Sequence, residues 1–291
     1  MIFVIFLVAP SNIIFLREIN IRHTFVFKTY MTRIQFSIFN FQFSILIALI
    51  SLFPFLTAKA QVNPKDSIIA TSLAGLSYTL QIPGGNLKNR FGLNSNAGLD
   101  FMYKTKHNLL IGIDGHFIFG GNLKEDSILK PISTADGNII ASDGSYADVR
   151  LYERGFSFAA KFGKLFPVFG PNKNCGIIFL AGAGFLQHKI RIEVTGNNVP
   201  QLNSDMKKGY DRLTNGFAIN EFVGYFYLGN RRLINFFGGF DFMQAWTKNR
   251  RAINFDTMMH DGTNRLDVLS GIRFGWVIPF YKKVPNQYYY Y

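Results

Sequence analysis

Apolar and polar residues alternate along most of the chain after residue 60, and the longest such run lies near the end. From Arg265 to Tyr281, one face is predicted to carry Leu266, Val268, Ile272, Phe274, Trp276, Ile278 and Phe280, interrupted by Ser270, and the other Arg265, Asp267, Gly271, Arg273 and Gly275. Successive side chains of a strand point to opposite faces, so this strand has one apolar and one charged face. Strands of soluble sheets usually run about five or six residues. A strand of about seventeen residues suits a tilted path across a bilayer.

The same two-residue period predicts seven further strands. With the last one, the predicted strands are Ala70–Ile82, Leu93–Tyr103, Leu109–Gly120, Arg154–Phe166, Gly176–Val194, Phe217–Gly229, Leu233–Lys248 and Arg265–Tyr281. The connections alternate between a shorter set (Lys104–His107, Pro167–Cys175, Asn230–Arg232) and a generally longer set (Pro83–Phe91, Gly121–Glu153, Thr195–Gly216, Asn249–Asn264). Bacterial outer-membrane barrels have short periplasmic turns, long outer loops and an even number of strands. The pattern therefore predicts an all-β fold, an eight-stranded antiparallel up-and-down transmembrane β-barrel with both ends in the periplasm.

The longest connection contains two Asp-Gly pairs, Asp136-Gly137 and Asp143-Gly144. Asp-Gly favours tight hairpin turns. Two interpretations follow: the strands extend beyond the membrane as a small hairpin, or the segment is an irregular loop.

The first sixty residues differ from the rest of the chain. Met31 begins a segment with one early cation, Arg33, followed by an apolar stretch from Phe43 to Leu56 and by Ala58-Lys59-Ala60. A charged start, a short apolar core and a small-x-small site are typical of a secretory signal peptide. We expect translation to start at Met31 and cleavage to follow Ala60. The predicted organisation is a leader and signal peptide over 1–60, a barrel over 61–281 and an aromatic tail over 282–291.

Composition favours strands over helices as the membrane-spanning elements. Hydrophobic residues make up 48% of the chain and aromatic residues 16%. No stretch after the leader approaches the roughly 18 consecutive apolar residues of a membrane helix. The single cysteine, Cys175, excludes an internal disulfide framework.

The basic surplus of the chain fits a membrane surface better than nucleic acid. The first sixty residues hold five of the 31 Lys and Arg and one of the 18 Asp and Glu, so the remainder keeps a surplus of nine positive charges. These cations are scattered among turns and loops, and an exported protein does not normally meet nucleic acid. We expect contact with outer-membrane lipid headgroups or lipopolysaccharide.

Charged side chains are predicted inside the barrel. By strand parity, the acids are Asp100, Asp114, Glu221, Asp241 and Asp267, and the cations are Lys161, Lys189, Arg191, Arg265 and Arg273. The interior of an eight-stranded barrel is just wide enough to be filled by side chains. Buried charges must be paired to be tolerated. We expect a lumen charge network, in which Arg273 pairs with Asp241 on the preceding strand; a gated pore or a binding site is the alternative.

A lipid-modifying enzyme would need a serine, a histidine and a carboxylate in contact. His116 shares an inner face with Asp114, and Ser157 lies on the next strand, so these three are the candidates. A buried, hydrogen-bonded histidine is the simpler interpretation. His188 falls on the predicted lipid-facing parity, near a strand end. We find no metal-ligand spacing and no cofactor motif.

The chain from about residue 65 to 281 resembles small OmpA/OmpX-like outer-membrane barrels, particularly uncharacterised ones from Bacteroidetes-type bacteria. The residues that carry the resemblance are Ala58-Lys59-Ala60-Gln61, the eight alternating strands and the closing pattern of Gly271, Phe274 and Trp276. The closing pattern resembles the assembly signal read by the barrel-insertion machinery. The chain departs from the family in continuing past Tyr281 to a second aromatic end, Tyr288 to Tyr291.

The resemblance implies location in the cell outer membrane, and we expect a protein without enzymatic activity. A structural or accessory role in the cell envelope is the first hypothesis, with partners contacted through loops or turns and a larger envelope complex as a possible setting. A narrow pore is the second and a lipid-modifying enzyme the third, because one fold hosts many functions.

Overall fold

The structure is a computed structural model that describes residues 67–125, 127–196, 198–229 and 234–281. The chain divides into two compact units, 1–59 and 60–291, and the described residues all belong to the second. The expected start at Met31, the signal peptide, the cleavage after Ala60 and the tail 282–291 lie outside the described residues. No helix in the described ranges is long and apolar enough to cross a membrane.

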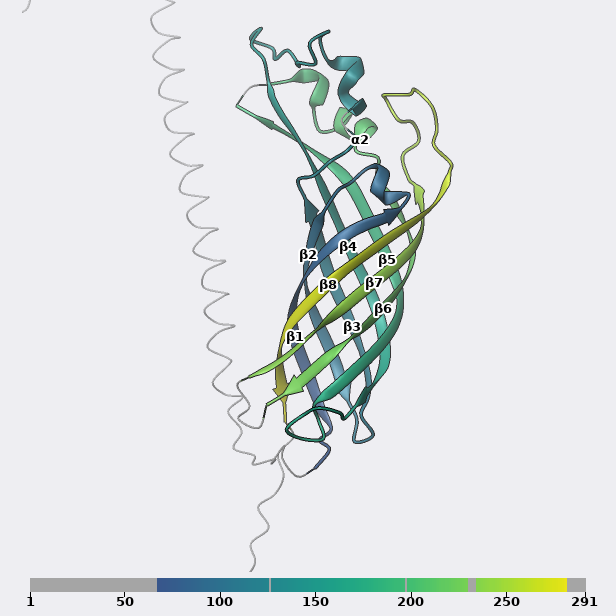
Figure 1. Ribbon diagram of the computed structural model, residues 1–291. Helices are drawn as coiled ribbons and strands as arrows, with labels where there is room; N and C mark the ends of the chain where they lie inside the picture. The colour runs from purple at the N-terminus through teal and green to yellow at the C-terminus, as the bar shows by residue number, and fades with distance from the viewer. Residues whose placement is uncertain (1–66, 126, 197, 230–233, 282–291) are drawn as a thin grey trace, which may run out of the picture. The chain divides into compact units, whose positions relative to one another are not determined.

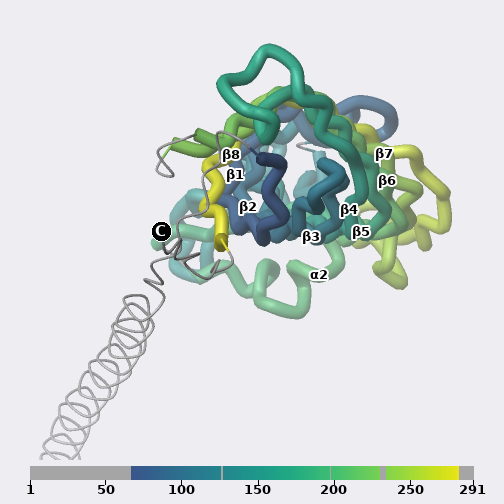
Figure 2. The backbone as a smooth tube through the Cα atoms, turned by 90° about the horizontal axis from the view of Figure 1, so that it is seen from below, coloured from purple at the N-terminus to yellow at the C-terminus, as the bar shows by residue number. Residues whose placement is uncertain are grey.

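Eight antiparallel strands form a closed ring in chain order (Figures 1 and 2). Their bounds are β1 Thr71–Gly85, β2 Asn94–Lys104, β3 Leu109–Gly120, β4 Asp148–Phe166, β5 Gly176–Thr195, β6 Thr214–Leu228, β7 Asn235–Asn249 and β8 Asn264–Phe280. Each strand pairs with its neighbours in sequence, and β8 closes the ring by pairing with β1 from Ser72↔Phe280 to Gly85↔Asp267. The predicted eight-stranded up-and-down barrel is confirmed.

The outer face of the barrel carries exposed apolar side chains on every strand. One example from each of β1 to β8 in turn is Leu76, Leu99, Ile113, Phe158, Phe179, Phe217, Phe240 and Ile272, each at least 47% exposed. A continuous apolar belt around a closed antiparallel ring is the outer surface of a membrane-spanning barrel, because water would not tolerate it. The protein is therefore a β-barrel of the outer-membrane type.

The connections differ at the two ends of the barrel (Figure 1). The turn end has the three short connections, around residues 105–108, 167–175 and 229–234. The loop end has the other four, around residues 86–93, 121–147, 196–213 and 250–263, and the last three of these are longer than any connection at the turn end. The short helices η2 Leu87–Asn89, η3 Ser127–Ile132, η4 Pro200–Leu202 and α2 Met206–Tyr210 lie in the loop-end connections. By the usual arrangement of such barrels, the turn end faces the periplasm and the loop end faces outward.

The β4–β5 hairpin extends farther toward the loop end than the sequence predicts. β4 begins at Asp148 rather than Arg154, and its pairing with β5 runs from Asp148↔Thr195 to Phe166↔Ile177. The adjoining loop is folded rather than irregular, because Asp143-Gly144 turns the chain between the bridged residues Ile140 and Tyr146. Gly144 has φ +82°, a conformation that favours glycine.

Candidate functional site

The middle of the barrel interior holds a layer of charged side chains centred on Arg273 of β8. Its guanidinium forms ion pairs with three carboxylates: Asp100 of β2, Asp114 of β3 at 3.2 Å and Asp241 of β7 at 3.2 Å. Lys161 of β4 also pairs with Asp114. All five side chains are at most 5% exposed. We call these five residues the charged layer; it combines three negative and two positive charges in a space shielded from water.

Uncharged polar groups add hydrogen bonds to the charged layer. Ser77 Oγ donates to Asp100 Oδ2 at 2.7 Å. Asn220 Nδ2 of β6 lies 3.2 Å from Asp241 Oδ2. Arg273 Nη2 donates to His116 Nε2 at 2.7 Å, so this nitrogen is an acceptor and the imidazole is neutral. Ser77 and Asn220 were not among the predicted site residues, because neutral residues on the inner face of a strand carry no charge pattern that would single them out.

The structure does not assemble the candidate serine–histidine–acid group. Ser157 Oγ has no hydrogen-bond partner within the described residues. Ser77 Oγ does approach His116 Nε2, at 3.1 Å, but the same nitrogen already accepts from Arg273. The imidazole is therefore not placed to take a proton from serine, which is what nucleophile activation requires.

Asp100, Asp114 and His116 are close enough to one another to offer ligand atoms to a metal ion. Arg273 Nη2 donates to all three of these residues. The guanidinium thus fills the position that a metal ion would need, and the donor set fits Arg273 better than a metal.

Apolar clusters close the interior above and below the charged layer. The turn-end cluster contains Leu73, Met102, Leu110, Leu165, Cys175, Ile178, Leu180, Phe222, Phe226, Leu228, Phe237 and Val277. The loop-end cluster combines strand residues with loop residues: Leu87, Phe91, Ile118, Ile128, Leu129, Ile139, Ala141, Leu186, Ile190, Ile192, Val199, Leu202, Tyr210, Ala218, Met243, Ala245 and Leu269. The loop end also buries polar side chains, among them Gln81, Asn94 and Asn96. The interior is thus filled by an apolar layer at the turn end, the charged layer and a mixed layer at the loop end.

Five of the ten predicted lumen residues do not join the charged layer, and three of these five do not face the interior. Glu221 is exposed on the outer face of β6, because the even-numbered residues of this strand point inward and Asn220 takes the inner position. Lys189 and Arg191 also point outward, while Ile190 and Ile192 are buried inside. The predictions that Glu221, Lys189 and Arg191 face the lumen were wrong. Arg265 lies at the loop end and pairs with Asp261 at 2.5 Å.

His188 and Asp267 form a separate polar group near the loop end. His188 is 1% exposed, and its Nε2 lies 2.9 Å from Asp267 Oδ2. Thr247 Oγ1 donates to the same oxygen at 2.5 Å. The prediction that His188 faces lipid was wrong, because the even-numbered residues of β5 point inward and His188 is one of them.

Ion pairs join all four outer loops. Glu125, in the β3–β4 loop, pairs with Arg90 of the β1–β2 loop at 3.5 Å and with Arg212 of the β5–β6 loop at 2.6 Å. Arg212 also pairs with Asp256 of the β7–β8 loop, and Arg90 lies 3.9 Å from Asp261 of that loop. We call these five residues the loop network. Because several part-buried charges share partners, the loops are held more firmly than isolated surface pairs would hold them.

Glu153 gives the loop end a measurable pH dependence. It lies in the part of β4 beyond the apolar belt, where the adjacent outward residue is Arg154, and it is 2% exposed. Burial raises the pKa of Glu153 from 4.5 to about 7; Asp267 adds to this, and hydrogen bonding from Asn94 opposes it. The folded state therefore holds a proton that the unfolded state has released between pH 4.5 and about 7. The stability that this proton contributes is fully present below pH 4.5 and is lost as the pH rises to about 7.

We expect Glu153→Gln to remove this loss and to raise the free energy of unfolding at pH 8 by roughly 3 kcal/mol. Urea unfolding in detergent at pH 4.5 to 8 measures the effect. Glu193→Gln is the control, since this side chain is 43% exposed and pairs with Arg191 on the same hairpin. Parallel pH curves for Glu153→Gln and the unaltered protein would contradict the prediction.

Comparisons with known proteins bear on the fold alone. No family model matches the chain, and no curated protein matches it. Among solved structures it is similar to neisserial surface protein A, with 9% identity, a TM-score of 0.36, and coverage of 71% of this chain and 96% of that one. It is also similar to Ail, the attachment invasion locus protein of Yersinia pestis, with 10% identity, a TM-score of 0.34, and coverage of 72% of this chain and 99% of that one. A third similar structure is the outer-membrane protein OprG of Pseudomonas aeruginosa, with 10% identity, a TM-score of 0.29, and coverage of 75% of this chain and 99% of that one.

Proposed function

We propose that this protein is a non-enzymatic outer-membrane barrel with a structural or accessory role in the cell envelope, related to the small OmpA/OmpX-like barrels of Bacteroidetes-type bacteria. The observation that carries the proposal is the layered interior. Two apolar clusters flank a charged layer whose cations and acids are engaged with one another. A solid interior suits a scaffold, since conduction needs a continuous polar path and catalysis needs access to reactive groups.

The loop end supports a role in contacting partners. The loop network holds the loops together, while large apolar side chains stay exposed on them: Ile140, Tyr146, Met206, Ile253, Met258 and Met259. Exposed apolar side chains on folded loops are typical of protein contact sites. A partner within a larger envelope complex is therefore the interaction that we propose for this end.

The outer rim supports contact with anionic lipid or lipopolysaccharide. Arg154 and Lys189 are directly paired across β4 and β5, and both point outward above the apolar belt. Like charges placed opposite each other repel, and an anionic headgroup between them would relieve that repulsion. Phe274 and Trp276, exposed on β8, are available to the barrel-insertion machinery as the proposed assembly signal.

Conductance separates the proposed function from a pore. We expect the purified, folded barrel to give no steady channel openings in a planar lipid bilayer, because the turn-end apolar cluster interrupts the polar path through the interior. A known porin reconstituted in the same membrane is the control. Regular channel openings of the unaltered protein would show that it is a pore and would contradict the proposed scaffold role.

Affinity purification of the full-length protein from native membranes tests the accessory role itself. We expect a stable complex to co-purify, and its loss when Met258 and Met259 are both replaced by serine. Recovery of the barrel alone from membranes crosslinked before extraction would contradict the accessory role.

A further inference from the structure

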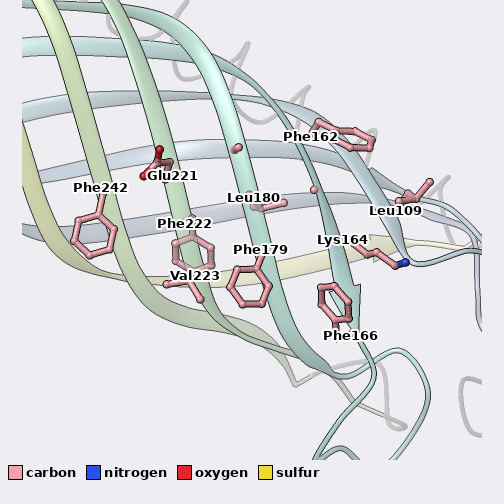
Figure 3. A pocket seen from close by; sticks show the side chains of 12 residues that line it. Leu109, Phe162, Lys164, Phe166, Phe179, Leu180, Glu221, Phe222, Val223 and Phe242 are labelled. Carbon is pink, nitrogen blue, oxygen red and sulfur yellow. The ribbon is translucent and has the colours of Figure 1, made fainter.

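The lipid-facing surface contains a groove over β4 to β7. Its volume is about 800 Å³, and its outward-facing lining includes Phe162, Phe166, Phe179, Ala181, Val223 and Phe242. Ala181 pairs with Phe162 of β4 on one side and with Glu221 of β6 on the other, and its small side chain leaves space between these two larger ones. Figure 3 shows Glu221 and Lys164 on either side of Phe179 and Leu180. Small residues in a membrane-facing surface permit close approach of another backbone.

Glu221 is a carboxylate in the middle of the apolar belt. Along β6, the outward positions before it are Phe217 and Ile219, and those after it are Val223 and Tyr225. Its inward neighbour, Asn220, is hydrogen-bonded to the charged layer, so Glu221 lies at the depth of that layer. Within the described ranges its carboxylate has no ion pair or hydrogen bond. A charged group facing hydrocarbon is costly and is a sign of function.

The groove continues to an exposed aromatic residue at the turn end. Phe169 is 91% exposed and adopts φ +57°, which is uncommon for a bulky residue. Tyr225, two residues from the groove residue Val223, donates its hydroxyl hydrogen to the Phe169 carbonyl at 2.8 Å. An apolar surface thus extends from mid-membrane to the periplasmic boundary.

We propose that this groove, with Glu221, binds a membrane-embedded segment of a partner protein that carries a lysine or arginine at the depth of Glu221. This rests on the proposed accessory function and names the surface and chemistry of one contact. The carboxylate supplies the charge complementarity, and in a low-dielectric membrane a buried ion pair of this kind selects its partner strongly.

Two other occupants fit the groove less well. Lipid acyl chains have no hydrogen-bond donor at mid-membrane depth, and lipid headgroups lie at the boundaries. In a second copy related by an axis along the membrane normal, residues meet partners at their own depth. The outward cations described on the strands are Lys164 near the turn end and the residues of the outer rim, so a second copy offers Glu221 no counter-charge at its depth.

Site-specific photocrosslinking of the full-length protein in native membranes tests this proposal. We expect benzoyl-phenylalanine at Val223 to give a defined protein adduct. The matched control is the same crosslinker at Ile111, in a second lipid-facing groove of about 400 Å³ over β1 to β3 that is lined without charged residues. Glu221→Gln should lower the yield at Val223 by about tenfold or more, whereas Glu221→Asp should retain it. Heat-modifiable migration of each variant shows that the barrel is folded.

A charge exchange provides the decisive result. The crosslinked partner peptide should contain a lysine or arginine; Glu221→Lys should abolish the adduct, and replacement of that partner residue by glutamate should restore it. An adduct with a second copy or with lipid alone, a yield unaffected by Glu221→Gln, or a peptide without a basic residue would overturn the proposal. If a complex still co-purifies through the loops while Val223 gives no adduct, the groove assignment fails and the accessory function stands.

Discussion

Replacing Arg273 by methionine is expected to lower the free energy of unfolding by about 3–5 kcal/mol, because removal of one partner leaves buried charges uncompensated. Arg273 pairs with Asp100, Asp114 and Asp241. After its removal Lys161 still neutralises Asp114, but Asp100 and Asp241 keep only neutral hydrogen-bond donors. Urea unfolding in detergent, with heat-modifiable migration as the readout of the folded fraction, measures the loss of stability.

The double variant Arg273→Met with Asp241→Leu should be less destabilised than the single one, since it removes one uncompensated acid together with the cation. Further replacement of Asp100 by asparagine should recover more. Arg150→Met is the control, because Arg150 is 63% exposed and its pair with Asp148 lies in water. Simple additivity of the Arg273 and Asp241 effects would rule out their coupling. Channel openings in Arg273→Met without loss of stability would instead identify the charged layer as a gate.

Gly216→Ala is expected to prevent the barrel from reaching its folded, heat-modifiable form. Gly216 points inward from β6, and a Cβ atom there would lie 1.8 Å from the carbonyl oxygen of Trp246 on β7. That oxygen belongs to the backbone, so relief requires separation of two paired strands, whereas a flexible side chain would simply move. Glycine in a strand often marks this kind of close backbone approach.

Gly115→Ala is the matched control for Gly216→Ala. A Cβ atom at Gly115 of β3 would lie 3.9 Å from its nearest neighbour, a carbon of Phe158, which is ordinary contact. The same added methyl group should therefore change the urea midpoint little. A Gly216→Ala protein that folds with an unchanged midpoint would contradict the strand geometry at β6 and β7.

The sequence predicted the strands well because the two-residue period is local. Asp100, Asp114, Lys161, Asp241 and Arg273 were all assigned to the interior, and the structure brings them into one layer. The expectation that Arg273 pairs with Asp241 identified one of its three acids. The pairing of Arg273 with Asp100 and Asp114 depends on ring closure, which brings β8 beside β1 and near β2 and β3.

The sequence misled where the surroundings of a strand change along its length. In the belt, apolar side chains point to lipid; beyond it, the outer face meets water and the apolar side chains pack inward under the loops. β5 is apolar on both faces within the belt, where Ile178, Leu180 and Leu186 pack inside, and Ile190 and Ile192 continue this inward face beyond the belt. The parity of Lys189 and Arg191 was therefore inverted. The available signal was length, because β5 has 20 residues and a crossing strand needs only about 9–11.

Glu221 was misassigned for a different reason. β6 is apolar on both faces, so its alternation is weak, and a charged residue was taken to mark the inner face. The neutral Asn220 occupies that face instead, through its contact with Asp241. The loop network could not be predicted from the sequence, because Arg90, Glu125 and Arg212 belong to loops that are separated by long stretches of chain.

The position of Arg273 on the last strand has a consequence for the order of events during folding. Asp100 and Asp114 lie on β2 and β3, and they meet the guanidinium only when β8 pairs with β1 and the ring closes. Before that moment, Asp100 would enter the hydrocarbon without a counter-charge, at a high free-energy cost. Closure of the ring and neutralisation of Asp100 thus coincide, and we expect a chain lacking β8 to stay at the membrane boundary and not to enter the bilayer as an open sheet.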